Sequence, residues 1–281
     1  MLARLRHPED RTRLLITGAV ALVSLVYLAP LYFVLVFATH PVEATYDFPP
    51  PVGFGTALAE NYARIHSSFE PYRPILNSLL VAIPKTAGLV LVSALAGYGF
   101  ARYRRVLGHR SLLMVAFATM FFPPSLGLIP FFIEMRWFGW LDTFLPLIVP
   151  AMASSFGVIW MYTYIQASVP DELYEAAEID GAGGLRTFRI VVLPIIRPGL
   201  AALGVWVFIT TWNDFKLPLI VLSSAEKLTV PLALMSLNSL YVADTPAVML
   251  GTAISLVPVF AVFFLLSKQF IAGLTSGAVK S

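Results

Sequence analysis

A charged segment interrupts an otherwise apolar chain at residues 168–198, which read SVPDELYEAAEIDGAGGLRTFRIVVLPIIRP. Acidic and arginine side chains concentrate there together with small residues, whereas long apolar runs lie on both sides. Six residues in this segment have a distinctive spacing: Glu175, Ala176, Ala177, Gly181, Leu193 and Pro194.

The composition is that of an integral membrane protein. Hydrophobic residues make up 58% of the 281 residues and charged residues only 12%, with a mean hydropathy of +0.80. Soluble domains average about 45–50% apolar and about 25% charged residues. The composition therefore excludes an ordinary soluble domain.

Six apolar segments are long enough to cross a bilayer, which takes about 20 helical residues. They form one predicted all-α membrane domain over residues 1–281. The first is longer than the apolar part of a signal peptide, so we expect it to be retained. The predicted spans cover residues 14–38, 75–101, 111–135, 144–166, 200–221 and 248–270.

The distribution of lysine and arginine predicts the orientation. Thirteen of these residues lie in the N-terminal segment, the loop after the second span, the charged segment and the C-terminal tail, against four in the alternate loops. Cytoplasmic loops carry the excess of positive charge. We therefore expect both termini and residues 168–198 to be cytoplasmic.

The charged segment begins with the pattern of a short helix. Ser168 and Asp171 have the spacing of a capping box, and Pro170 suits a first helical turn. Gly181 stands where a left-handed residue would end the helix. The pattern predicts a helix from about Pro170 to Asp180.

A second amphipathic stretch follows, with Leu185, Phe188 and Val192 expected on one face. Pro194 and Pro198 are expected to break the path before the fifth span. Two short helices at a bend, parallel to the membrane, would result.

Polar residues near the spans are candidates for a translocation path because they are costly in lipid. Asn77 lies near the start of the second span, and Trp212, Asn213 and Asp214 lie in the predicted fifth. The alternative is that the polar residues hold helices together. Lys85 is expected to pair with Asp214 or to extend to an interface.

Small residues and prolines predict local helix geometry. Gly97 and Gly99 indicate close packing of the second span against a neighbour. Pro123 and Pro124 predict a kink in the third span.

Several chemistries find no support in the sequence. The absence of cysteine excludes disulfides and thiol catalysis, and the four histidines are too scattered for a metal cluster. The chain has no Gly-x-x-x-x-Gly-Lys-Ser/Thr sequence for nucleotide binding. The basic residues form no continuous stripe of the kind that binds nucleic acid.

The spacing of the charged segment resembles the cytoplasmic "EAA" loop of bacterial ABC importer permeases. Asn77-Ser78-Leu79, Trp212-Asn213-Asp214-Phe215 and the ending at 272–280 are similar to the carbohydrate-uptake branch of that family. The smaller-partner type of maltose, lactose and glycerol-3-phosphate permease is the nearest likeness.

The resemblance implies a coupling helix between spans four and five that docks on an ATPase. Its implied coupling residues are Glu175, Ala176, Ala177, Asp180, Gly181, Leu193 and Pro194. Small Ala176 and Ala177 would let the helix press into a groove of the partner, and Glu175 would pair with a basic residue there. The alternative is an ordinary helix at the membrane interface.

The resemblance also implies partners and a location. A homologous second permease, two copies of an ABC ATPase and an extracytoplasmic sugar-binding protein would assemble with this chain in a bacterial inner membrane. ATP and Mg²⁺ would bind the ATPase, so no catalytic residue, metal or cofactor is expected on this chain.

Two other functions compete with a sugar importer. An ion-coupled secondary transporter would use intramembrane charges such as Lys85 and Asp214. A membrane-embedded lipid-linked transferase would bind a divalent cation through the acidic residues near Glu175.

Overall fold

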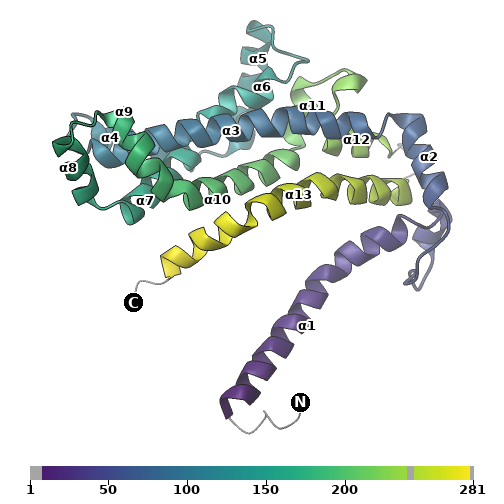
Figure 1. Ribbon diagram of the computed structural model, residues 1–281. Coiled ribbons are helices and arrows are strands. Elements are labelled where there is room, and N and C mark those ends of the chain that lie inside the picture. The colour runs from purple at the N-terminus through teal and green to yellow at the C-terminus, as the bar shows by residue number, and fades with distance from the viewer. Residues whose placement is uncertain (1–7, 239–243, 279–281) are drawn as a thin grey trace. The chain divides into compact units, whose positions relative to one another are not determined.

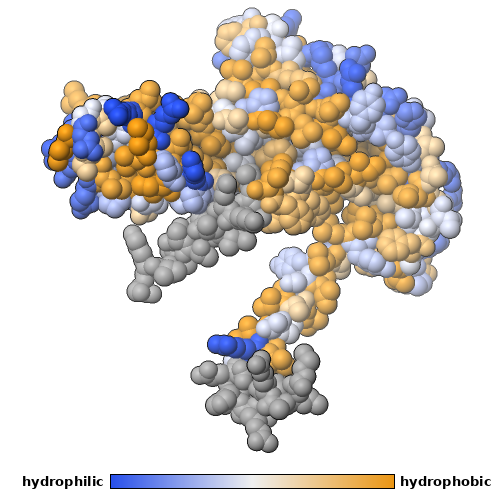
Figure 2. Space-filling view, viewed as in Figure 1, coloured by the Kyte–Doolittle hydropathy of each residue, from blue (hydrophilic) through white to orange (hydrophobic). Residues whose placement is uncertain are grey.

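The computed structural model describes residues 8–238 and 244–278, which form mainly helices (Figure 1). Hydrophobic side chains cover much of the surface in Figure 2, as expected for contact with lipid. This confirms the all-α membrane fold. Five segments of the described chain are long and apolar enough to span a bilayer: Thr12–Phe37, Tyr72–Arg102, Leu145–Ser168, Gly184–Trp212 and Thr245–Leu265.

Contacts within the chain group it into two compact units. The first comprises Met1–Pro71 and Leu234–Ser255, and the second comprises Tyr72–Ala233 and Leu256–Ser281. The first unit contains α1 (Pro8–Phe37), the 3₁₀ helix η2 (Val42–Tyr46), α2 (Leu58–Ser68), the end of α12 (Val230–Ser236) and the start of α13 (Thr245–Ala278).

The second unit contains most of the helices. They are α3 (Tyr72–Arg102), α4 (His109–Thr119), η3 (Pro124–Gly127), α5 (Leu128–Trp137), α6 (Leu145–Ile148), η4 (Pro150–Met152), α7 (Ser155–Ser168), α8 (Asp171–Ile179), α9 (Gly184–Thr187), η5 (Phe188–Val192), α10 (Leu193–Trp212), α11 (Lys216–Val221) and η6 (Ala225–Lys227).

The segment predicted as the third span is not one helix. α4 ends at Thr119, and α5 begins at Leu128 after the 3₁₀ turn η3. Pro123 adopts an extended conformation instead of a helical one. A proline disfavours helix in the residue before it, so two in succession end the helix here where a kink was expected.

The fifth span begins earlier than predicted and also ends earlier. α10 starts at Leu193 and runs through Pro198 to Trp212. The prediction that Pro194 and Pro198 break the chain is therefore wrong. Pro194 occupies the first turn, where no backbone N–H is needed, and membrane helices tolerate an internal proline.

The core of the second unit is built on α3, against which α7 and α10 pack. Gly97 makes the approach to α7 possible, because a Cβ there would lie 2.7 Å from the backbone nitrogen of Tyr162. Gly199 on α10 likewise leaves room for the ring of Tyr164 on α7, so these two helices also approach closely. The expectation of close packing is confirmed for Gly97, whereas a Cβ at Gly99 would have no neighbour within 4 Å in the described part of the chain.

The N-terminal end of α3 holds the segment that follows α11. The side-chain amide of Asn77 donates to the carbonyl oxygens of Glu226 and Leu228, at 2.9 Å each. The backbone N–H of Val230 donates to the Ser78 hydroxyl at 2.9 Å. These bonds satisfy polar groups that would otherwise be buried unpaired.

Asp142 ties the same segment to the turn between α5 and α6. Its carboxylate accepts from the backbone N–H groups of Ser223 and Ser224, both at 3.0 Å, and pairs with Lys227 at 3.1 Å. The Ser224 hydroxyl and these N–H groups hold the pKa of Asp142 well below its usual range. The turn and the segment are thereby joined.

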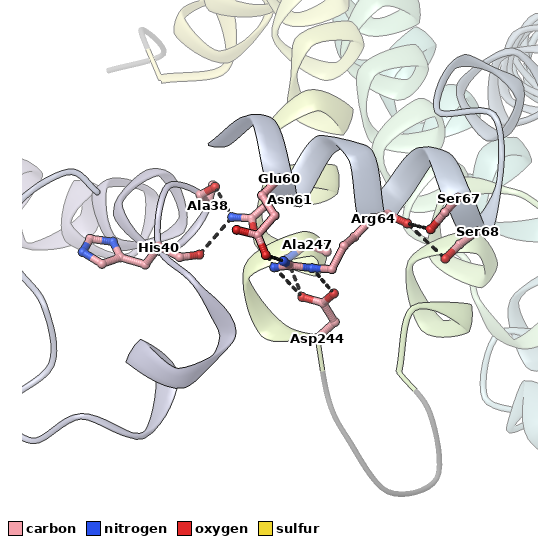
Figure 3. Close-up of polar contacts among 9 residues, drawn as sticks. All are labelled: Ala38, His40, Glu60, Asn61, Arg64, Ser67, Ser68, Asp244 and Ala247. Atoms are coloured by element: carbon pink, nitrogen blue, oxygen red, sulfur yellow. Dashed lines mark hydrogen bonds and ion pairs between the residues drawn. The ribbon is translucent and has the colours of Figure 1, made fainter. Parts of the chain in front are cut away.

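A polar cluster organises the first unit (Figure 3). The buried Asn61 amide donates to the carbonyls of Ala38 (2.7 Å) and His40 (3.0 Å) at the end of α1. Arg64 bonds Asn61 and pairs with Asp244 at 2.8 Å. Asp244 in turn accepts from the backbone N–H of Ala247 and so caps α13.

Gly97→Ala is expected to destabilise the fold although alanine favours helix, because its Cβ would meet the α7 backbone. Overpacking of this kind costs about 1–3 kcal/mol. Gly99→Ala is the matched control and should be neutral or stabilising by up to about 1 kcal/mol. Thermal unfolding of the purified chain in detergent measures both, and equal melting temperatures would contradict the packing.

Asp244→Ala is expected to lower the unfolding temperature more than Glu60→Ala does. Both carboxylates pair with Arg64, but the Asp244 side chain is 18% exposed and the Glu60 side chain 67%. Loss of the helix cap costs about 1 kcal/mol, and an exposed ion pair contributes about 0–1 kcal/mol. A larger effect from Glu60→Ala would show that the cap contributes little.

Candidate functional site

The charged segment lies between α7 and α10 as two short helices, α8 and α9, followed by the π-helical turn η5. Figure 1 shows α8 and α9 close to the C-terminal end of α3. Ser168 ends α7, and the N-cap of α8 is Pro170, which forms no side-chain cap bond. The predicted capping box is therefore wrong, because Val169 and Pro170 are extended and carry the chain away from Ser168.

The C-terminal end of α8 follows the prediction closely. Gly181 has a φ of +70°, in the left-handed region that favours glycine. Its N–H donates to the carbonyl of Glu178 at 3.0 Å, and the N–H of Ala182 donates to that of Ala177 at 2.9 Å. This pair of bonds is a Schellman motif, which ends a helix and turns the chain.

α8 presents one face to the protein and another to its surroundings. Tyr174 and Ala177 are buried, whereas Glu175 and Ala176 are exposed. The expectation that both alanines face a partner is therefore wrong in this structure for Ala177. Residues 174 and 177 lie on one face because they are three positions apart.

Large apolar side chains are also exposed at the end of α8 and at the start of α9. Ile179 is 87% exposed and Leu185 74% exposed, on either side of the Gly181 turn. Phe188 and Val192 are buried, so the predicted common face of Leu185 with these two residues is wrong. The switch to π-helical spacing in η5 changes which residues share a face.

The remaining coupling candidates occupy different surroundings. Asp180 is the exposed C-cap of α8. Leu193 is half-buried against the core at the start of α10, and Pro194 is exposed in its first turn. The structure thus brings Glu175, Ala176 and Asp180 onto one short helix and its end, and places the Leu193-Pro194 pair beyond η5.

The C-terminal end of α3 holds this element in place. Arg102 lies over the ring of Tyr174, with its Cζ 5.1 Å from the ring centroid, and forms an ion pair with Glu178. The Tyr98 hydroxyl donates to the carbonyl of Gly184 at 2.9 Å. Burial, followed by the proximity of Tyr98 and Asp171, raises the pKa of Tyr174 to about 12.

Two of the candidate path residues are enclosed by the protein. Asn77 is buried and gives its amide hydrogens to backbone carbonyls. Trp212 is buried beside Phe208, with ring centroids 5.7 Å apart. Neither side chain presents an open face in this conformation.

The other two path residues lie beyond the end of α10 and not within a span. Asn213 is exposed and donates to the carbonyl of Ile209 at 2.8 Å. Asp214 accepts from the backbone N–H of Lys216 at 3.1 Å, so it stabilises the start of α11. Lys85 is close enough to Asp214 for attraction, without an ion pair between these two described side chains.

Sequence reasoning missed two features of the segment. The exposure of Ile179 and Leu185 was hidden because an amphipathic pattern normally turns apolar residues inward. The α3 anchor was missed because Arg102 and Glu178 are far apart in sequence. A possible signal for the anchor was the alternation of tyrosine and arginine from Tyr98 to Arg104.

Comparison with known proteins identifies the family. The model of the binding-protein-dependent transport system inner membrane component matches residues 90–275. The lactose transport system permease protein LacG of Rhizobium radiobacter is 36% identical over 229 residues, covering 82% of this chain and 83% of LacG. The diacetylchitobiose uptake system permease protein NgcG of Streptomyces coelicolor is 29% identical, covering 99% of this chain and 93% of NgcG.

A solved structure has the same fold. It is a bacterial ABC transporter involved in the import of the acidic polysaccharide alginate, with a TM-score of 0.71 and 22% identity, covering 95% of this chain and 99% of the matched one. From the family model and these relatives, the chain belongs to the binding-protein-dependent transport system inner membrane components, multi-pass permease subunits of ABC transporters.

Proposed function

We propose that this chain is the permease subunit of an ABC importer that carries a sugar or sugar-like solute into the cytoplasm. The observation that carries the proposal is the match of the family model to residues 90–275, a range that includes the whole charged segment and the helices α7 and α10 on either side of it. The sugar class rests on relatives such as LacG and NgcG, which are named for lactose and diacetylchitobiose.

The complex that we propose contains this chain, a homologous second permease, two copies of an ABC ATPase and an extracytoplasmic sugar-binding protein. Both termini and the α8–α9 element lie in the cytoplasm, in line with the excess of Lys and Arg. The contact of Arg102 with Glu178 supports this arrangement, because it puts two segments expected in the cytoplasm together.

The docking surface that we propose is the exposed face of α8 and the following turn. Glu175 offers a charge for a basic residue of the ATPase, and Ala176 permits close approach of the helix. Ile179 and Leu185 add exposed apolar area, and removing that area from water on docking is favourable. The ends of the docking element are set by Asp180 and Gly181 after α8 and by Leu193 and Pro194 at the start of α10. Ala177 is buried and packs the element against the rest of the chain.

ATP and Mg²⁺ bind the ATPase subunits in this proposal. Closure of the ATPases would displace the docking helices and switch the spans between inward-open and outward-open states. Of the four path candidates, Asn213 is exposed and Asp214 is half-buried, so these two could contact a solute directly. Asn77 and Trp212 are buried and would instead hold the helices that line the path.

The two competing functions have less support. A lipid-linked transferase would need acidic side chains that converge on a cation, and the described residues contain no group of three or more suited to hold one. A secondary transporter would need paired charges within the membrane, whereas Asp214 lies beyond the end of α10.

Co-purification of the tagged chain from its own membranes, followed by mass spectrometry, tests the proposed function. An ABC ATPase and a second permease are expected in the purified complex, and a binding protein after mild cross-linking. That binding protein can then be screened for sugar ligands by thermal shift. A stable chain that retains no ATPase would contradict the importer.

Gly181→Ala is expected to reduce coupling between ATPase and permease. No described residue lies within 4 Å of the new Cβ, so the expected effect comes from the φ of +70°, at about 1–2 kcal/mol. ATP-driven uptake of the sugar identified above, divided by ATP hydrolysis, should fall several-fold while the amount of chain in the membrane is unchanged.

Gly183→Ala is the matched control for this measurement. It lies in the same turn, has an ordinary φ of −66° and likewise has no neighbour within 4 Å. Wild-type coupling is expected for it. Equal coupling in the two variants would show that the geometry of the turn is dispensable.

A further inference from the structure

The C-terminal end of α3 contacts both short helices of the charged segment. Arg102 reaches α8, because it covers the Tyr174 ring and pairs with Glu178 one turn further along that helix. Tyr98, one turn before Arg102, reaches the start of α9 through its bond to the Gly184 carbonyl. Two neighbouring turns of one helix thus hold two helices that lie more than 70 residues away in sequence.

The contacts around Tyr98 are closely packed. Its ring centroid lies 5.2 Å from that of Phe188 and 6.2 Å from that of Tyr174. Gly184 also lies close to Tyr103, since a Cβ at Gly184 would come 2.5 Å from the Tyr103 hydroxyl. Closely packed interiors have low compressibility and transmit strain between the elements they join.

Arg102 is the best placed of the arginines in this region to hold α8. The Arg102 side chain is 23% exposed and lies against the Tyr174 ring, whereas its partner Glu178 is 63% exposed. Arg104 contacts Asp171 only at 3.5 Å, and both of those side chains are more exposed. An exposed and long ion pair contributes little.

We infer that Arg102 is a positioning residue that makes α3 move with the docking helices, so that movement of the ATPase enters the membrane through α3. This inference rests on the proposed function. α3 is also the helix against which α7 and α10 pack, so its displacement reaches the other helices of the same unit. Arg102 acts through Tyr174 and Glu178 and does not itself form the docking surface.

The ring of Tyr174, and not its hydroxyl, is the part that matters here. Its buried hydroxyl has no hydrogen-bond partner among the described residues, whereas its ring lies under Arg102. Tyr174→Phe should therefore preserve the attachment, and Tyr174→Leu should weaken it. Arg102→Lys keeps the charge but loses the planar group that lies over the ring, so an intermediate effect is expected.

The test uses the complete complex with its ATPase, reconstituted in nanodiscs. The chain contains no cysteine, so Tyr72→Cys places a single fluorescent label on this chain, at an exposed position at the other end of α3. The ATPase subunits should be cysteine-free or blocked. The change in fluorescence on trapping with ATP and vanadate reports movement of α3, and ATP hydrolysis and retained ATPase are measured on the same sample.

Arg102→Ala should retain the ATPase and its hydrolysis but reduce the fluorescence change by about twofold or more, with the contacts of Tyr98 still in place. Tyr174→Phe and the control Arg104→Ala should behave as the wild type. A wild-type fluorescence change in Arg102→Ala would overturn the inference. Loss of the ATPase from that variant alone would also overturn it, because Arg102 would then serve docking itself.

Two further outcomes concern an Arg102→Ala variant that does not fold and an unmodified chain that retains no ATPase. If Arg102→Ala does not fold, Arg102→Lys is compared with Arg104→Lys, and equal fluorescence changes in these two variants would reject the inference. If the unmodified chain retains no ATPase, the proposed function has failed, which is a different result from the failure of Arg102.

Discussion

The close approach of α3 to α7 and α10 is the constraint on which the second unit depends. In lipid, apolar side chains gain little from leaving their surroundings, so helices associate through tight packing of their surfaces. Gly97 lets α7 approach α3, and Gly199 lets Tyr164 lie against α10. Because α3 is packed in this way along its length, groups at its two ends have defined positions.

Polar contacts are concentrated at those two ends. At the N-terminal end of α3, Asn77 and Ser78 bond the backbone that follows α11. At the C-terminal end, Tyr98 and Arg102 hold α9 and α8. This distribution follows from the membrane, since polar side chains are inexpensive only near water or when paired within the protein. One helix thereby connects the segments on the two sides.

The helices and the charged segment could be predicted from sequence because each depends on local chemistry. Gly181 marks the end of α8 because few other residues adopt its φ without strain. The wrong predictions arose where a residue type was read by its usual local role and its place in the folded chain was different. Ser168 has the residue type of a helix cap, yet it belongs to α7. Pro198 has the type of a helix breaker, yet α10 continues through it.

The sequence by itself determined an all-α membrane protein with a charged segment between two of its spans, because hydropathy, proline and glycine act over a few residues. The tertiary structure alone decided which face of that segment is free. It buries Ala177 and Tyr174, exposes Ile179 and brings Arg102 to Glu178. Such pairings depend on how distant helices pack, and no local pattern specifies which residues will meet across that distance.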